Sequence, residues 1–369
     1  MERSMDRVFE MLEKESPLFS VIVPTYKISE SNLRQCIDSL LYDSQDVEII
    51  LVDDNKNLDI CGKVLDEYAE KYNNISVIHQ ENQGVSVARN AGMSIAVGKY
   101  LIFVDPDDWV AENFYSQMTL AVQKNPSSDV IILAAIVDYN GKQFTNHFWH
   151  TSRSFQGTDK DDLELQLIAK GATSYFPTEI GVGVPWAKIY RNEFVRENGL
   201  DFNPSLRRMQ DNIFNMYAFE FANEIVYIDE PIYYYRKSMD SVTNKKNDKV
   251  IYYFDLVNDE VEKFIQKFNK PKIFEDALHI KRLIGINSYY KLYFQFATTS
   301  SEKKKMRQEF RELLEREEYA NSLKQVNTAY LLPKEKIFIS ILKQKHLRIF
   351  SFLQKLEKLS ARLKSRHFS

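Results

Sequence analysis

Three aspartates follow one short apolar stretch and have the spacing to bind a divalent cation. Residues 100–104 predict a buried strand, and Asp105, Asp107 and Asp108 come directly after it. Aspartate is rarely buried without a partner, and Mg²⁺ or Mn²⁺ takes carboxylate oxygens and bridges them to substrate phosphates. The alternative is an acidic turn that caps the following helix. The turn by itself does not separate these two interpretations.

Two further apolar stretches also end in polar residues. The first ends in Pro24, Thr25 and Tyr26, and the second ends in Asp53 and Asp54. Because apolar stretches alternate with helical periodicity, we predict a doubly wound α/β domain with a mostly parallel sheet flanked by helices. The expected strands are 19–26, 47–52, 75–79, 100–104 and 129–137, and the expected helices are 30–42, 58–72, one opened by 83–92, and 111–124. Ligands bind beyond the carboxyl ends of such strands, so these polar residues should share one ligand site.

The glycine-rich motifs of many nucleotide-binding proteins are missing. No G-x-G-x-x-G follows the first strand and no G-x-x-x-x-G-K-[ST] occurs, so a metal and basic side chains would have to neutralise the phosphates. For a sugar nucleotide, Asp54 could accept a hydrogen bond from a base imide, and Tyr26 could stack on the base. Asp105 would reach the ribose or the metal, and Asp107 would bind the metal. The metal would act as a Lewis acid on the leaving nucleoside diphosphate, while Asp108 would hold the turn.

Two later segments carry further candidates. Asp211 stands near the start of a helix whose apolar face comprises Ile213, Phe214, Met216, Tyr217 and Phe221. It is either an acid favoured by the helix dipole or a general base that takes the proton of an acceptor hydroxyl. Arg236 follows a strand at 225–228 and a turn at 229–231. It could offset charge on the departing phosphates, or it could be a surface cation of a solvated loop.

The charge distribution predicts a second region of different character. Residues 1–240 contain 22 Lys and Arg against 37 Asp and Glu, whereas residues 241–369 contain 27 against 15. Residues 334–366 carry ten basic and two acidic residues, interleaved with apolar ones. This basic amphipathic end predicts contact with an anionic membrane surface or an acidic partner; the alternative is a bundle helix with a solvated basic face. No nucleic-acid motif accompanies the charge, and the helical region is a candidate surface for homo-oligomerisation.

The sequence predicts three parts. These are a lead-in helix at residues 1–16, an α/β domain at 17–245 and a helical domain at 246–369. The N-terminus carries charges where a signal peptide needs apolar residues, and no window approaches about 18 uninterrupted apolar residues. Cys36 and Cys61 lack the spacing of metal ligands. We therefore expect a cytoplasmic protein with reduced thiols, which could be peripheral at the inner face of the cell membrane.

Seven short motifs follow one another through the predicted α/β domain. They are F-S-V-I-V-P-T-Y (19–26), L-V-D-D-N (51–55), N-Q-G-V-S-V-A-R-N-A-G (82–92), F-V-D-P-D-D-W (103–109), V-P-W-A-K-I-Y-R (184–191), Q-D-N (210–212) and Y-Y-Y-R-K…S-V-T (233–243). In this order they closely resemble family 2 glycosyltransferases of the GT-A fold, most of all the bacterial members that build capsular and other surface polysaccharides. The resemblance covers roughly residues 17–245.

This resemblance implies an inverting transfer from a nucleotide-diphospho-sugar, usually UDP-linked, with Mn²⁺ or Mg²⁺. The acceptor would be a hydroxyl of a growing glycan or of a lipid-linked saccharide. By the resemblance, the nucleotide would be contacted by Pro24, Tyr26, Asp54 and Arg89. The D-x-D element would be Asp105 and Asp107, the base would be Asp211, and the donor-sugar and acceptor side would be lined by Trp186 and Lys188.

The sequence also departs from the family pattern. Gln210 stands where the family often has Glu, and the first two motifs read P-T-Y-K and D-D-N-K in place of P-T-Y-N and D-D-G-S. Since the aspartates are intact, the departures bear on sugar specificity more than on activity. Two other interpretations stay open: a nucleotidyltransferase, which normally has a glycine-rich basic loop after its first strand, and a non-catalytic scaffold in a polysaccharide assembly complex.

Overall fold

The computed structural model describes residues 16–55, 60–177, 179–237 and 246–353. The chain divides into two compact units, of which unit 1 is Met1–Glu164 with Tyr175–Ser238 and unit 2 is Leu165–Ser174 with Met239–Ser369. Unit 2 thus includes a short segment from within the predicted α/β domain. The predicted helix at residues 1–16 lies outside the described residues except for Ser16.

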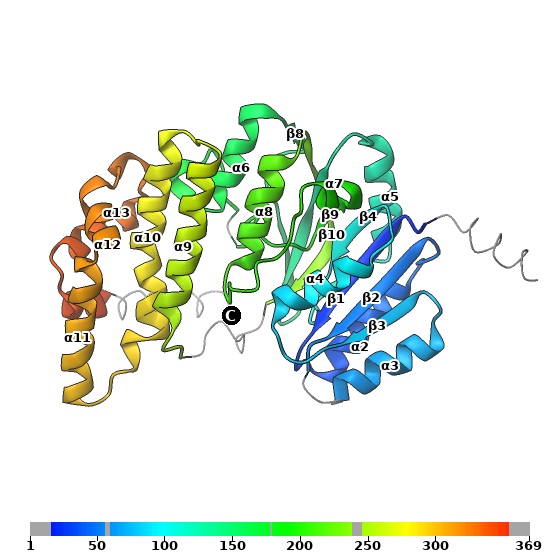
Figure 1. The fold of residues 1–369 in the computed structure, drawn as a ribbon, viewed down its shortest axis with the longest axis horizontal. Helices are drawn as coiled ribbons and strands as arrows, with labels where there is room; N and C mark the ends of the chain where they lie inside the picture. Colours follow the sequence, from blue (N-terminus) through cyan, green and yellow to red (C-terminus); the bar gives the residue numbers. More distant parts are fainter. Residues whose placement is uncertain (1–15, 56–59, 178, 238–245, 354–369) are drawn as a thin grey trace, which may run out of the picture. The chain divides into compact units, whose positions relative to one another are not determined.

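Unit 1 is built on a mixed sheet whose first half is parallel, as the sequence predicts. The strands lie in the order β3-β2-β1-β4-β9-β6-β10-β5, and the first four are parallel to one another (Figure 1). β9 runs antiparallel between β4 and β6, and β7 and β8 pair with β6 and β10. The bounds are β1 Phe19–Thr25, β2 Val47–Asp53, β3 Ile75–His79, β4 Tyr100–Phe103, β5 Trp109–Val110, β6 Val130–Tyr139, β7 Lys142–Asn146, β8 Arg153–Phe155, β9 Lys188–Arg191 and β10 Ile225–Arg236.

The register of the parallel strands brings their carboxyl ends to one edge. Thr25 pairs with Asp53, and Ile22 pairs with Phe103 at the end of β4. The polar residues that follow these strands therefore start from the same edge of the sheet, as predicted. Every residue of β1 and β4 is buried, which explains why both strands are continuous apolar stretches.

Helices cover this sheet, and one of them approaches it closely. Gly92 of α4 lies against Ile22 of β1, where an added Cβ would stand 2.5 Å from the Ile22 side chain. This close contact fixes the position of α4 and of the residues one and two turns before Gly92. The helices are α2 Glu30–Leu41, α3 Ile60–Lys71, α4 Val85–Ile95, α5 Phe114–Lys124, α6 Lys160–Gln166, α7 Asn192–Glu197 and α8 Gln210–Phe221.

One alternative and one local expectation from the sequence are wrong. The acidic turn does not cap a helix, because β5 follows it directly and α5 begins only at Phe114. Residues 229–231 do not form a turn either. They lie within β10, which runs through Pro231 with a register shift on each side of that proline. A bulge accommodates a residue that has no N–H to donate, so a single strand carries both predicted segments.

Unit 2 is helical in its described part, as predicted. Its helices are α9 Val250–Lys267, α10 Lys272–Leu292, α11 Ser300–Glu315, α12 Glu317–Gln325, α13 Pro333–Lys343 and a last stretch at 347–353, with short 3₁₀ turns at Lys170–Ala172, Phe294–Phe296 and Thr328–Tyr330. In the basic amphipathic end, Phe338, Leu342 and Phe350 are buried, which favours the bundle interpretation for these side chains. Residues 354–366 lie outside the described part. None of the described helices is both long and apolar enough to cross a bilayer.

Candidate active site

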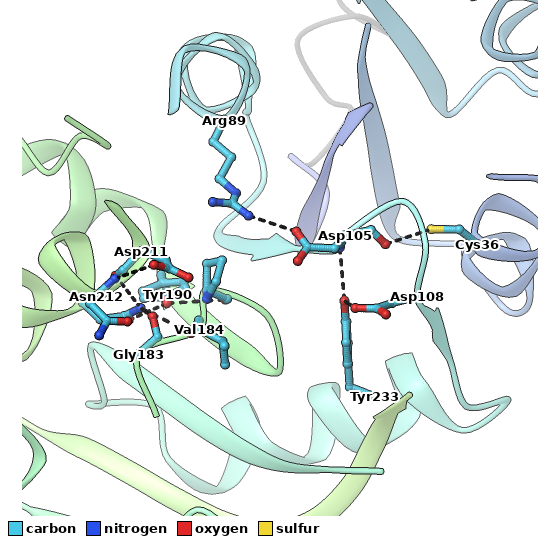
Figure 2. A network of polar contacts seen from close by, with 12 residues as sticks. Cys36, Arg89, Asp105, Asp108, Gly183, Val184, Tyr190, Asp211, Asn212 and Tyr233 are labelled. Atoms are coloured by element: carbon cyan, nitrogen blue, oxygen red, sulfur yellow. Dashed lines mark hydrogen bonds and ion pairs between the residues drawn. The ribbon is translucent and has the colours of Figure 1, made fainter. Parts of the chain in front are cut away.

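The last aspartate of the acidic turn holds the turn in place. Asp108 is fully buried and accepts hydrogen bonds from the Tyr233 hydroxyl at 2.6 Å and from the Arg236 backbone N–H at 2.7 Å. The Tyr233 hydroxyl also accepts a bond from the Asp105 backbone N–H at 3.1 Å. β10 therefore anchors the turn at two points, as Figure 2 shows for Tyr233. Burial and the neighbouring carboxylates raise the pKa of Asp108 well above its usual value.

The first aspartate of the turn is paired with a buried arginine. Arg89 Nη2 donates to Asp105 Oδ1 at 2.9 Å, and only 4% of Arg89 is exposed (Figure 2). The guanidinium lies over the Phe202 ring at 5.1 Å. Its Nε and Nη1 atoms have no hydrogen-bond partner among the described residues. Both atoms are buried, and buried guanidinium nitrogens normally have partners, so they are candidates for contact with an anion that enters the site.

The middle aspartate has the electrostatic surroundings of a cation ligand. Burial and the charge of Asp105 raise the pKa of Asp107 to about 6. Neighbouring carboxylates repel each other, and a bound cation relieves this repulsion. Within the described residues, no group of three or more acidic, histidine or cysteine side chains could hold a metal. Asp105 and Asp107 nevertheless fit Mg²⁺ or Mn²⁺, because such ions bind through one or two carboxylates plus substrate phosphates.

Arg236 supports the same turn with its side chain. Its Nε donates to the Asp107 carbonyl at 2.8 Å, and its Nη2 donates to Gln35 Oε1 at 2.7 Å. The guanidinium also lies over the Trp109 ring at 4.6 Å. Arg236 is therefore not a cation of a solvated loop. Its predicted contact with departing phosphates stays a prediction.

The predicted nucleotide end of the site is partly covered. Asp54 is 2% exposed, and its carboxylate accepts bonds from Gln80 Nε2 and from the backbone N–H groups of Gln83 and Gly84, each at 2.8 Å. It thereby fixes the segment that leads into α4. A carboxylate has lone pairs for further donors, so its predicted bond to a base imide stays a prediction.

The three residues at the end of β1 differ in exposure. Tyr26 is 42% exposed and its hydroxyl accepts a bond from Asn82 Nδ2 at 2.9 Å, so its ring presents a surface on which a base can stack. Pro24 and Thr25 are buried in β1. The Thr25 hydroxyl has no hydrogen-bond partner among the described residues, and the same holds for Ser86 in the first turn of α4. The predicted ligand contact of Thr25 stays a prediction, and the Ser86 hydroxyl is an additional candidate.

The candidate base lies in the first turn of α8. Asp211 Oδ1 accepts the Asn212 backbone N–H at 2.9 Å, and the cap position belongs to Met209, which has left-handed backbone angles with φ 53°. Part of the Asp211 side chain remains exposed, yet burial of its surroundings raises its pKa, while the nearby charge of Arg89 opposes the rise. Asp105, Arg89 and Asp211 thus face one region from three elements (Figure 2). A carboxylate with a raised pKa in such a place suits a general base.

A buried layer supports α8 from the side of β9. Asn215 is fully buried, and its Nδ2 donates to the carbonyls of Gly183 at 2.8 Å, Asp211 at 3.1 Å and Val184 at 3.3 Å. Its Oδ1 accepts from the Tyr190 hydroxyl at 2.8 Å. A single side chain therefore joins the loop before β9 to the first turn of α8.

Trp186 and Lys188 belong to this buried layer. Trp186 is 2% exposed and stacks on Tyr233 with ring centroids 4.6 Å apart. Lys188 is fully buried, its Nζ donates to the Val184 carbonyl at 2.5 Å, and burial lowers its pKa to about 7. Both side chains are covered in this structure and support the loop before β9. Their predicted place on the donor-sugar and acceptor side stays a prediction.

Sequence reasoning assigned no role to Tyr233 and Asn215. Tyr233 lies within a quoted motif, but its partner Asp108 is 125 positions away, so their contact had no local signal. Asn215 had a weak local signal in the sequence, since it is a polar residue inside the apolar face of a helix. Both act by holding the backbone of acidic residues.

The fold and the site define an α/β enzyme of the GT-A type, with acidic residues and a buried arginine at the carboxyl edge of its sheet. Residues 20–198 match the model of the family described as Glycosyl transferase family 2. These residues, just under half of the chain, thus resemble a family 2 glycosyltransferase domain, and the chain is a glycosyltransferase.

Several known proteins are similar to this chain. The Bacillus subtilis glycosyltransferase EpsH is 28% identical over 267 residues, which cover 72% of this chain and 74% of EpsH. EpsJ of the same organism is 32% identical over 62% of this chain and 63% of its own length. The solved structure of Staphylococcus aureus TarS 1–349 with UDP-GlcNAc has a TM-score of 0.62 and 18% identity, covering 93% of this chain and 92% of that chain. At this identity the likeness to TarS establishes the fold alone.

Proposed function

We propose that the chain transfers a sugar, with inversion, from a nucleotide-diphospho-sugar to a hydroxyl of a growing glycan or lipid-linked saccharide in surface polysaccharide synthesis. UDP is the proposed nucleotide. The observation that carries the proposal is Arg89, a buried guanidinium paired with Asp105, with two nitrogens lacking a partner among the described residues. Such nitrogens suit the oxygens of a diphosphate.

In the proposed reaction, Asp211 takes the proton of the acceptor hydroxyl. The hydroxyl oxygen then attacks the anomeric carbon from the face opposite the nucleoside diphosphate, and the bond from that carbon to the diphosphate oxygen breaks, which inverts the configuration. Arg89 offsets the negative charge left on the diphosphate, and Arg236 keeps the acidic turn in place. When bound at Asp107 and Asp105, Mn²⁺ or Mg²⁺ supplies further positive charge for the leaving group.

The nucleotide side of the proposal rests on the end of β1 and on α4. The exposed Tyr26 ring offers a stacking surface for the base, and the unpartnered Thr25 hydroxyl lies at the same strand end. Asp54 orients the segment that begins α4 and is the proposed acceptor for a base imide. We further propose that the basic end at 334–366 contacts the inner face of the cell membrane, where a lipid-linked acceptor would be held.

The proposal is tested by transfer and hydrolysis assays with a panel of nucleotide sugars. Each donor is assayed with Mn²⁺, with Mg²⁺ and with EDTA. We expect one UDP-sugar to be consumed, EDTA to suppress its consumption by at least about 100-fold, and the product to have the inverted anomeric configuration. The proposal fails if no donor is consumed and no nucleotide binds with metal present. Retention of configuration, or full activity in EDTA, would overturn the mechanism but not the enzyme class.

A further inference from the structure

A pocket in unit 2 combines an apolar floor with a basic rim. It has a volume of about 380 Å³ and is formed by the end of α10, the 3₁₀ turn Phe294–Phe296, the start of α11 and the stretch at 347–353. All of these elements lie within unit 2. The transfer reaction has no role for this pocket, so its chemistry needs a separate account.

The floor of the pocket is a built apolar surface. Tyr290, Phe294 and Leu347 line it, and each is less than 10% exposed. Aromatic side chains support the floor from behind: Tyr290 packs on Phe350 with ring centroids 5.2 Å apart, and Phe294 packs on Phe310 at 5.5 Å. Because the rings hold one another in edge-to-face contacts, the floor does not collapse into the cavity.

The rim carries three cations and no acid. Lys303, Arg307 and Arg348 line the pocket, and none of them has an ion-pair partner within the described ranges. Elsewhere on the same helix the basic residues behave differently, since Lys305 is paired with Glu309 at 3.6 Å. Phe352, also at the rim, is 61% exposed. Unpaired cations beside an exposed aromatic ring are typical of surfaces that meet the headgroups of anionic lipids.

An amphiphilic anion satisfies both parts of this pocket at once. A hydrocarbon chain removes the apolar floor from water, and a phosphate at the rim meets the three cations. An inorganic anion would leave the floor exposed to water, and a neutral chain would leave the cations unpaired. Within α13 the side chains of Phe338, Ile339 and Leu342 are buried, so this described helix does not present all of its apolar residues to a membrane. We propose that the pocket binds one phosphate-bearing membrane lipid, with an acyl chain on the floor and the phosphate between Lys303, Arg307 and Arg348.

The pocket is tested with soluble probes by isothermal titration calorimetry on the full chain. We expect dodecyl phosphate, below its micelle concentration, to bind with a stoichiometry of one. Butyl phosphate should bind more than about 100-fold more weakly because it lacks most of the chain, and inorganic phosphate should not bind measurably. Dodecyl maltoside, which has the chain without the charge, should bind at least about tenfold more weakly than dodecyl phosphate.

Substitutions on one helix provide a matched control. Lys303→Gln should weaken dodecyl phosphate binding about fivefold, whereas Lys304→Gln, the neighbour that does not line the pocket, should leave it unchanged. Ala297→Phe fills a half-buried lining position and should remove the dependence on chain length. Thermal melting of each variant separates loss of the site from loss of the fold.

Vesicles then test the membrane source of the lipid. Vesicles of phosphatidylcholine with phosphatidylglycerol should sediment the protein, and Lys303→Gln should reduce sedimentation more than Lys304→Gln. If the two variants reduced sedimentation equally, the interaction would depend on surface charge alone, and the proposal that the pocket binds a lipid would be overturned. Binding of dodecyl phosphate without any recruitment to vesicles would overturn the membrane lipid as occupant. Both readouts are independent of sugar transfer, so they hold or fail separately from the proposed function.

Discussion

The acidic turn after β4 and the first turn of α8 each present carboxylates to the same site, but they are supported in opposite ways. The turn places three aspartates within four positions, and the side chains that hold them, Tyr233 and Arg236, come from a distant strand. At α8 a single aspartate is held locally: its backbone carbonyl accepts a bond from the Asn215 side chain, and its carboxylate accepts one from the Asn212 backbone N–H. The turn concentrates negative charge, whereas α8 isolates one carboxylate.

This difference has a chemical consequence. Within the turn, burial and the charges of neighbouring aspartates raise the pKa values of Asp107 and Asp108, so the negative charge of the turn is unfavourable until a cation binds. Asp211 has its pKa raised by burial and held down by Arg89, which leaves a carboxylate that can accept a proton and release it again. The turn is suited to binding and α8 to proton transfer. The following predictions, from the largest expected effect to the smallest, test that division.

Asp211→Asn should separate proton transfer from donor binding. The amide cannot accept the acceptor proton, so we expect kcat to fall by at least about 1,000-fold while the donor Kd changes less than about threefold. Donor binding is measured by calorimetry with Mn²⁺, and transfer is measured with the same donor. If Kd rises as much as kcat falls, Asp211 acts as a structural residue. The division between a turn that binds and a helix that transfers a proton would then be wrong.

Asp107→Asn should reveal the electrostatic cost of the turn without any metal. Because the folded pKa of about 6 lies above the usual 3.8, the folded state keeps this proton more tightly than the unfolded state does. Stability from this group is therefore greatest at low pH and falls as the pH rises from about 4 to about 6, by up to about 3 kcal/mol.

The measurement is urea unfolding of wild type and Asp107→Asn in EDTA between pH 4 and pH 7. The variant should gain stability relative to wild type across that interval, because asparagine does not titrate. Asp201→Asn, at an exposed aspartate with no ion pair among the described residues, is the control for a general charge effect. If the difference in unfolding free energy between wild type and Asp107→Asn did not change with pH, the aspartates of the turn would not destabilise the folded protein by repulsion.

Tyr233→Phe should weaken the support of the turn while leaving α8 unchanged. The substitution removes the hydroxyl that donates to buried Asp108 and accepts from the Asp105 N–H, which should cost about 2 kcal/mol of unfolding free energy. Tyr234→Phe, on the same strand with a half-buried ring, should cost less than about 0.5 kcal/mol. Equal losses of unfolding free energy in the two variants would show that the Tyr233 hydroxyl has no special role in holding the turn.

Much of the first half of this fold could be predicted from sequence, because a buried parallel strand is a continuous apolar stretch and its carboxyl end is marked by polar residues. That reasoning placed the carboxyl ends of β1, β2 and β4 at one edge and identified Asp108 as the residue that holds the turn. It failed where the cause is not local. β10 continues through Pro231 only because a bulge absorbs it. The burial of Trp186 and Lys188 depends on Tyr233 of β10 and on Phe148, which lies between β7 and β8.

Asn215→Ala should have the smallest effect and the most specific one. The substitution removes the bonds from Nδ2 to the Gly183 and Asp211 carbonyls, but the Asp211 carboxylate itself is still present. If Asn215 positions the carboxylate, kcat should fall about tenfold with little change in the donor KM, and the acidic limb of the kcat–pH profile should move. A residue that only stabilises the fold would lower the amount of active enzyme without moving that limb. Active-site titration with a tight-binding nucleotide corrects for the folded fraction. An unchanged kcat and pH profile after that correction would mean that α8 positions Asp211 without the help of Asn215.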